Sequence, residues 1–233
     1  MTDKHTLHIF DEDLQLLTEE ITRLAAHVSE ALKGALAALD SGDAALAQAV
    51  IDSDREIDVI QTCINAHTVR TLTRQQAVAD DLRAILAAAR IAPHLERIGD
   101  YAKNTAKRSQ RLSKPVDGEI LTQFKWMITR IQSMLQRVID AYLRHDAEAA
   151  NVAWSDDAEL DALYAKLFNH LLERMSNDGK QVADGTQLLF IAKGLERAGD
   201  HVTDIAEEVY LMVTGEPLQG PRPKVDEQGL RTD

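Results

Sequence analysis

The stretch that decides the fold is LERIGDYAKNTAKR, residues 95–108, because the chain repeats it one hundred residues later as LERAGDHVTDIAEE, residues 195–208. Both copies contain Glu-Arg-X-Gly-Asp, so a glycine occupies the same place in each, at Gly99 and Gly199. A glycine inside a helix costs about 1 kcal/mol relative to alanine. Two such glycines at matching places indicate that another backbone or a bound ion must come close.

A second acidic motif is duplicated in the same order. DREID at residues 54–58 and DAELD at residues 157–161 each begin eleven residues after an aspartate, Asp43 or Asp146, that can start a helix. Solvated surfaces have no reason to repeat both motifs at nearly equal spacing. The pattern therefore predicts an internal duplication of two units, each of about one hundred residues.

Amphipathic helices are indicated by apolar residues that recur at steps of three and four. The three clearest series are Leu14, Leu17, Ile21, Leu24, Val28, Ala31 and Ala35; Leu121, Phe124, Ile128, Ile131, Leu135, Val138 and Tyr142; and Leu188, Ile191, Leu195, Val202, Ile205, Val209 and Met212. Aromatic residues make up only 4% of the chain, which also favours helices over sheets.

Turn signals divide the chain into six predicted helices of about 25–35 residues. They are DSGD at 40–43, LTRQQAVADD at 72–81, LSKPVDG at 112–118, RHD at 144–146 and SNDGK at 176–180. The prediction is an all-α fold of two tandem antiparallel three-helix bundles related by a pseudo-twofold. The bundles cover residues 1–115 and 116–215, and residues 216–233 are predicted to be a disordered tail.

Composition narrows the class of protein. The formal net charge of −12 argues against nucleic acid and anionic lipid as partners and favours cations or basic protein surfaces. Cys63 is the single cysteine, so no intrachain disulfide can form. The sequence has neither a secretory signal pattern nor a run of about 18 uncharged apolar residues. We therefore expect a cytoplasmic protein.

The duplicated acidic residues predict metal binding. Positions i, i+4 and i+8 of a helix lie near one stripe, and antiparallel packing would set two such rows against each other. Close carboxylates repel unless cations bind, and oxygen ligands suit Mg²⁺, Ca²⁺, Mn²⁺ or ferric iron. The candidate ligands are Asp54, Asp58, Glu96, Asp100 and Asn104 in the first half, and Asp157, Asp161, Glu196, Asp200 and Asp204 in the second.

Simpler interpretations stand beside this one. Acidic residues at four-residue spacing are common on solvated helix faces, where Arg97 and Arg197 could pair with them. His94 and His201 flank the motifs and could be outer ligands, although a satisfied surface histidine is the simpler assignment. The Glu-x-x-His signature of di-iron bundles does not occur in the chain, which counts against a ferritin-like oxidase.

From about residue 10 to residue 214 the chain resembles the PhoU family of phosphate-uptake regulators. The stretches that carry this resemblance are LERIGDYAKNTAKR, LERAGDHVTDIAEE and the upstream TRQQAVADDLRAIL. The resemblance implies multinuclear metal clusters, often iron, on the ten candidate ligands, with zinc, manganese and magnesium as alternatives. It also implies a cytoplasmic negative regulator, not an enzyme, that connects the ATP-binding subunit of the phosphate ABC transporter with the sensor histidine kinase of a two-component system. Its contact with the membrane would be indirect, through these partners, and a homodimer is expected.

Two other functions stay open at this point. One is a metal-binding bundle with a storage or catalytic role, which needs an open coordination position. The other is a structural bundle that oligomerises through the apolar seams of the first and fourth helices, and it predicts that substitutions in the acidic motifs leave function unchanged.

Overall fold

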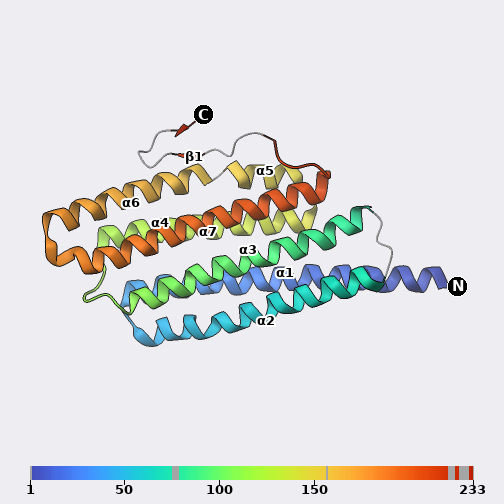
Figure 1. Cartoon of the computed structure of the whole chain (residues 1–233), viewed down its shortest axis with the longest axis horizontal. Helices are drawn as coiled ribbons and strands as arrows, with labels where there is room; N and C mark the ends of the chain where they lie inside the picture. Colours follow the sequence, from blue (N-terminus) through green and yellow to red (C-terminus); the bar gives the residue numbers. More distant parts are fainter. Residues whose placement is uncertain (1, 75–78, 156, 220–223, 226–230, 233) are drawn as a thin grey trace.

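A computed structural model describes residues 2–74, 79–155, 157–219, 224–225 and 231–232, and the side chains of residues 2–11, 74, 157, 224–225 and 231–232 lie outside that description. Figure 1 shows its elements, which in chain order are α1 (Thr2–Ser41), α2 (Ala44–Arg74), α3 (Ala79–Ser109), α4 (Gly118–Arg144), α5 (Ala147–Ser155), α6 (Asp157–Asn177), a 3₁₀ turn η1 (Gly179–Gln181), α7 (Val182–Thr214), β1 (Lys224–Val225) and β2 (Arg231–Thr232). The predicted all-α class is confirmed.

The helices form two bundles that lie side by side (Figure 1). Helices α1, α2 and α3 pack against one another, and α4, α5 and α6 pack around α7. Contacts of α3 with α7 and of α1 with α4 join the bundles, and the α3–α7 contact is the most extensive between any two elements of the described chain. Both repeated stretches therefore lie on the two helices that meet at the centre.

Local sequence explains where the helices end. Gly42 has a φ of 67°, a left-handed conformation that stops α1, and its N–H donates to the Ala38 carbonyl. The Asp43 carboxylate then accepts a hydrogen bond from the backbone N–H of Ala45 at 2.7 Å, which caps α2. Asp117 caps α4 in the same way. The predicted turn signals are thus helix boundaries.

The fifth predicted helix is described as α5 and α6, on either side of Asp156, which lies outside the described residues. At the end of α5 the Ser155 hydroxyl donates to the Asn151 carbonyl at 3.0 Å. The second bundle, with α4, α5 together with α6, and α7, is consistent with the predicted three helices.

The predicted apolar seams form the core. All the residues of the α4 and α7 series are buried, and so are those of the α1 series except the half-buried Leu14. Burying one large apolar side chain contributes roughly 1.5–3 kcal/mol. Because α1 and α4 cover each other, with Gln132 donating to the Ser29 carbonyl at 3.0 Å, their seams are not available for oligomerisation.

Beyond α7, the described part of the predicted tail contains β1 and β2, which pair antiparallel. The prediction of disorder concerns mainly residues that lie outside the description, and it stays a prediction. Among the described helices, none combines the length and the apolar composition that a membrane crossing requires.

Candidate metal-binding clusters

The first acidic cluster lies where α2 crosses α3. Lys103 of α3 places its ammonium nitrogen 2.6 Å from Asp54 Oδ2 and 2.5 Å from Asp100 Oδ1. The two carboxylates come from different helices, so the predicted facing of the acidic rows is present at this point. A lysine bridges them, because Lys103 lies one turn beyond Asp100 on the same side of α3.

Glu96 belongs to the same cluster, and its surroundings disfavour the ionised carboxylate. Burial and then the neighbouring Asp100 carboxylate raise the pKa of Glu96, and Asp58 adds to the effect. Arg97 opposes it from the solvent side, 3.3 Å from Asp100 Oδ2. The carboxylates of Glu96, Asp100 and Asp58 are therefore close enough to disfavour full ionisation together.

Asn104, the last predicted ligand of the first half, lies elsewhere. It lines a cavity between α3 and α7 together with Tyr101, Arg108, Phe190 and other residues of the two helices. Eight residues of helix advance about 800°, which is about 80° past two full turns. The i+8 position of α3 has therefore rotated toward α7, and the predicted straight row of three is a row of two.

The second acidic cluster lies where α6 meets α7. Burial raises the pKa of Glu196, and the Asp200 and Asp161 carboxylates raise it further. Lys193 lowers this pKa, because its ammonium nitrogen lies 2.9 Å from Glu196 Oε1. The other carboxylate oxygen, Glu196 Oε2, is buried and has no hydrogen-bond partner. Asp157, predicted as a further ligand, begins α6, and its side chain lies outside the described residues.

Asp204 also departs from the predicted row. Its Oδ2 lies 3.4 Å from Nδ1 of His94 and 3.4 Å from Nδ1 of His201, at the contact of α3 with α7. The same helix rotation displaces Asn104 from the first cluster and Asp204 from the second. Each residue stands eight positions after the glutamate of its motif copy, Glu96 or Glu196.

The chemistry of both clusters suits a hard cation. Their donors are carboxylate oxygens, and the carboxylates that crowd Glu96 and Glu196 are the kind of set that cations neutralise. The second cluster fits better, because Glu196 Oε2 is a buried acceptor with no donor. In the first cluster an incoming cation would have to displace the Lys103 ammonium from Asp54 and Asp100.

Gly99 has a packing role. A Cβ atom at this position would lie 2.8 Å from Cδ1 of Ile57 on α2, which is closer than carbon atoms approach. The glycine thus admits an isoleucine side chain of α2, and the nearest protein atoms are side-chain atoms, not backbone. Gly199 is likewise buried in α7. Helix packing beside the acidic residues therefore explains Gly99.

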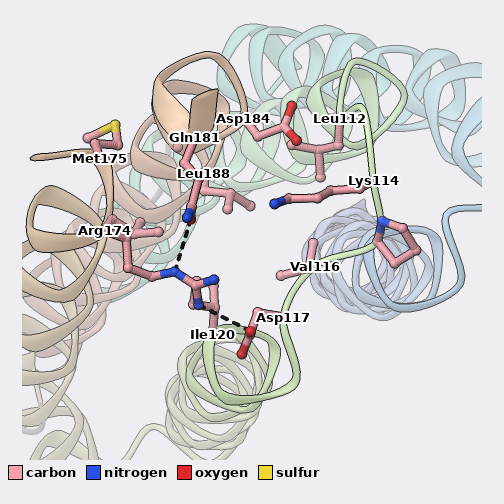
Figure 2. A pocket seen from close by; sticks show the side chains of 13 residues that line it. Leu112, Lys114, Val116, Asp117, Ile120, Arg174, Met175, Gln181, Asp184 and Leu188 are labelled. Carbon is pink, nitrogen blue, oxygen red and sulfur yellow. Dashed lines mark hydrogen bonds and ion pairs between the residues drawn. The ribbon is translucent and has the colours of Figure 1, made fainter. Parts of the chain in front are cut away.

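A separate pocket lies beside the segment that joins the two bundles (Figure 2). Figure 2 shows Arg174 reaching both Asp117, at 3.2 Å, and Gln181, at 3.2 Å. Ser113 donates through its N–H and its hydroxyl to the Asp184 carboxylate. These polar groups satisfy one another, which indicates that this site anchors the connecting segment to α6 and α7.

The architecture defines a class of protein: a duplicated helical bundle with one acidic cluster in each half. A family model described as "PhoU domain" matches residues 21–109 and again residues 124–209. The chain belongs to the PhoU family.

Relatives match over nearly the full length. A phosphate-specific transport system accessory protein PhoU homolog of Rhizobium meliloti is 37% identical over 227 residues, which cover 97% of this chain and 96% of the relative. A homolog of the same description from Caulobacter vibrioides is 39% identical over 224 residues, covering 96% and 97%. The crystal structure of PhoU from Pseudomonas aeruginosa superposes with a TM-score of 0.84 at 30% identity and covers 89% of this chain and 100% of that one.

A phosphate transport system regulatory protein PhoU from Streptococcus pneumoniae gives a TM-score of 0.83 at 29% identity, covering 90% of this chain and 99% of that chain. The fold predicted from the resemblance is therefore the fold of solved family members. The ligand assignments and the identity of a metal stay predictions.

Proposed function

We propose that this chain is a non-catalytic negative regulator of phosphate uptake and of the phosphate-starvation response. The observation that carries the proposal is the end-to-end match with phosphate-specific transport system accessory proteins, in which both halves match the family model. The chain would act as an adaptor between the ATP-binding subunit of the phosphate ABC transporter and the sensor histidine kinase of a two-component system. It would work in the cytoplasm, reaching the membrane only through these partners.

The acidic clusters are the part of the molecule that we assign to a cofactor. Asp54, Asp58, Glu96 and Asp100 would hold cations in the first half, and Asp161, Glu196 and Asp200 would hold them in the second, where Asp157 is a further candidate. Iron is the first candidate, and manganese, zinc and magnesium are alternatives. Bound cations would neutralise the crowded carboxylates and tie α2 to α3 and α6 to α7.

Charge supports protein partners with basic surfaces. The chain carries 38 acidic and 26 basic residues, so its field attracts cationic faces and repels nucleic acid. A homodimer fits the same role, because a symmetric pair would present two copies of each docking surface.

A reporter for the phosphate-uptake operon, read in plentiful phosphate, tests the regulatory role. Deletion of the gene is expected to give strong expression despite the phosphate, and the wild-type chain is expected to restore repression. An unchanged reporter after deletion would contradict the proposal and would favour a metal-binding bundle with a storage or catalytic role.

The same reporter tests the clusters. Asp100→Asn combined with Asp200→Asn is expected to fail in restoring repression, because the substitutions remove one charge from the centre of each cluster. Asp52→Asn is the matched control, since Asp52 is exposed on α2 and bonds only locally, to Gln48 at 2.8 Å. Full repression by the double variant, with protein levels equal to wild type, would separate the clusters from the regulatory function.

The adaptor role is tested by copurification. The full chain is expected to retain the kinase and the ATP-binding subunit when each is expressed with it in turn. Retention of neither partner would contradict the adaptor role even if the reporter responds.

A further inference from the structure

Two histidines from different bundles meet at the centre of the molecule. His94 of α3 and His201 of α7 place their Nδ1 atoms 3.0 Å apart, and their ring centroids are 5.3 Å apart. The Asp204 carboxylate completes a triangle, with Oδ2 at 3.4 Å from each Nδ1. Each side chain is between about a quarter and a third exposed, so solvent ions have access to the triangle.

The triangle has the size of a metal site. A tetrahedral zinc ion with bonds of about 2.0–2.1 Å holds its ligand atoms about 3.3–3.4 Å apart. The separations of 3.0, 3.4 and 3.4 Å lie close to that value and need only small side-chain movements. In the absence of a cation, two imidazole nitrogens this close must share a proton, since two lone pairs repel each other.

The ligand chemistry also favours a borderline transition metal. Imidazole nitrogen suits zinc, copper, iron and nickel, whereas calcium and magnesium select oxygen sets such as the two acidic clusters. Tyr101 stacks on the His201 ring at 5.9 Å between centroids and so restricts its orientation.

The triangle is absent from the other side of the α3–α7 contact. The positions one hundred residues away from His94, His201 and Asp204 are Gly194, Tyr101 and Asn104, respectively. These three line the cavity described above, beside which Arg108 stacks over the Phe190 ring at 4.3 Å. The site is therefore not part of the duplicated acidic design, and among the described residues it occurs on one side of the α3–α7 contact only.

We propose that His94, His201 and Asp204 bind one divalent transition-metal ion of the zinc class, which connects the two bundles through α3 and α7. Water would occupy the fourth position, as is common where a protein supplies three ligands. This site differs from the acidic clusters in donor type and in place, and the proposal does not depend on the regulatory function.

The test uses the full chain, stripped with chelator and then given zinc chloride alone. Competition with a chromophoric chelator is expected to show one zinc more per chain for wild type than for His94→Gln or His201→Gln. His67→Gln is the matched control, because His67 bonds Glu20 at 2.7 Å between α1 and α2, away from the triangle. Equal zinc content in the wild type and both triangle variants would overturn the proposal.

Two further measurements keep the test decisive if a variant folds poorly. The X-ray absorption spectrum of wild-type protein loaded with one zinc is expected to show scattering from two imidazoles, and an all-oxygen shell would overturn the assignment. Zinc is also expected to raise the Tm of wild type and of His67→Gln but not of Asp204→Asn, because a ligand stabilises only the state that binds it. An equal rise in all three proteins would exclude the triangle.

Discussion

The ammonium nitrogen of Lys103 lies 2.6 Å from Asp54 Oδ2, so an internal cation bridges α2 and α3 in the first acidic cluster. The second half has Thr203 at the matching position, and its hydroxyl donates to the Asp200 carbonyl instead. The second cluster instead has Lys193, whose ammonium nitrogen lies 2.9 Å from Glu196 Oε1, so the two clusters place their lysine differently although they derive from one repeated motif. This difference determines how each should respond to substitution.

Lys103→Met is expected to destabilise the metal-free protein. The substitution leaves Asp54 and Asp100 facing each other without the ammonium, and all three side chains are at most 22% exposed. We expect a loss on the order of 1–3 kcal/mol in the free energy of unfolding, measured by urea denaturation at pH 7. Lys33→Met, which removes an exposed partner of Glu30, is the control and should change stability by less than about 0.5 kcal/mol. Equal effects of the two substitutions would show that the bridge contributes nothing.

Glu196→Gln is expected to stabilise the metal-free protein at neutral pH. The pKa of Glu196 is raised on folding, so the folded state binds its proton more tightly than the unfolded state does. Ionisation of this group above the folded pKa therefore opposes folding, and the opposition disappears as the pH falls toward the ordinary glutamate value of 4.5. Denaturation curves at pH 7 and pH 4 should show the advantage of the glutamine only at pH 7.

Glu30→Gln serves as the exposed control, since loss of an exposed ion pair should change the free energy of unfolding by less than about 0.5–1 kcal/mol. Loaded cations should reverse the result for Glu196→Gln, because the substitution then removes a ligand. A glutamine variant that is less stable than wild type at pH 7 without metal would contradict the direction of the pKa shift.

The effect of Gly99→Ala on stability should depend on the side chain at position 57. Alanine gains about 1 kcal/mol of helix propensity, but its Cβ would meet Ile57 Cδ1 at 2.8 Å, and overpacking costs about 1–3 kcal/mol. Ile57→Val removes that atom. We expect Gly99→Ala to give no gain in the wild-type chain and to stabilise the Ile57→Val chain by about 1 kcal/mol. Additive effects in the double-mutant cycle would rule out the contact as the reason for the glycine.

Trp154→Phe should lower the free energy of unfolding more than Trp126→Phe does. Trp154 is 8% exposed, and its indole N–H donates to Glu207 Oε1 at 2.8 Å, which ties α5 to α7. Leaving the Glu207 acceptor without this donor is expected to cost about 1–2 kcal/mol. Trp126 is 54% exposed, so its replacement should be nearly neutral and should remove most of the fluorescence that acrylamide quenches. Strong quenching in the Trp126→Phe protein would contradict the burial of Trp154.

The sequence predicted the helices well because their signals are local. Apolar spacing marked the buried seams, and Gly42 with Asp43 marked a helix boundary through its own backbone and side-chain chemistry.

The candidate site was predicted less completely, because it depends on the angle at which each residue leaves its helix axis and on how the helices pack. Glu96 and Asp100 stay together, whereas Asn104 and Asp204 turn toward the other bundle, since a helix does not repeat in exactly four residues. Lys103 could have been expected from its spacing to Asp100. The meeting of His94 with His201 could not, because it depends on how two helices 107 residues apart in sequence pack.

The fusion of two copies in one polypeptide has a consequence for polarity. A dimer of identical subunits has two equivalent ends, and any change of residue appears in both. Here Lys103 stands where the second copy has Thr203, and His201 stands where the first copy has Tyr101, so the two copies differ at positions that contribute to their sites. The molecule is in effect a covalently linked heterodimer. Its two halves present different surfaces, so another protein can distinguish one from the other.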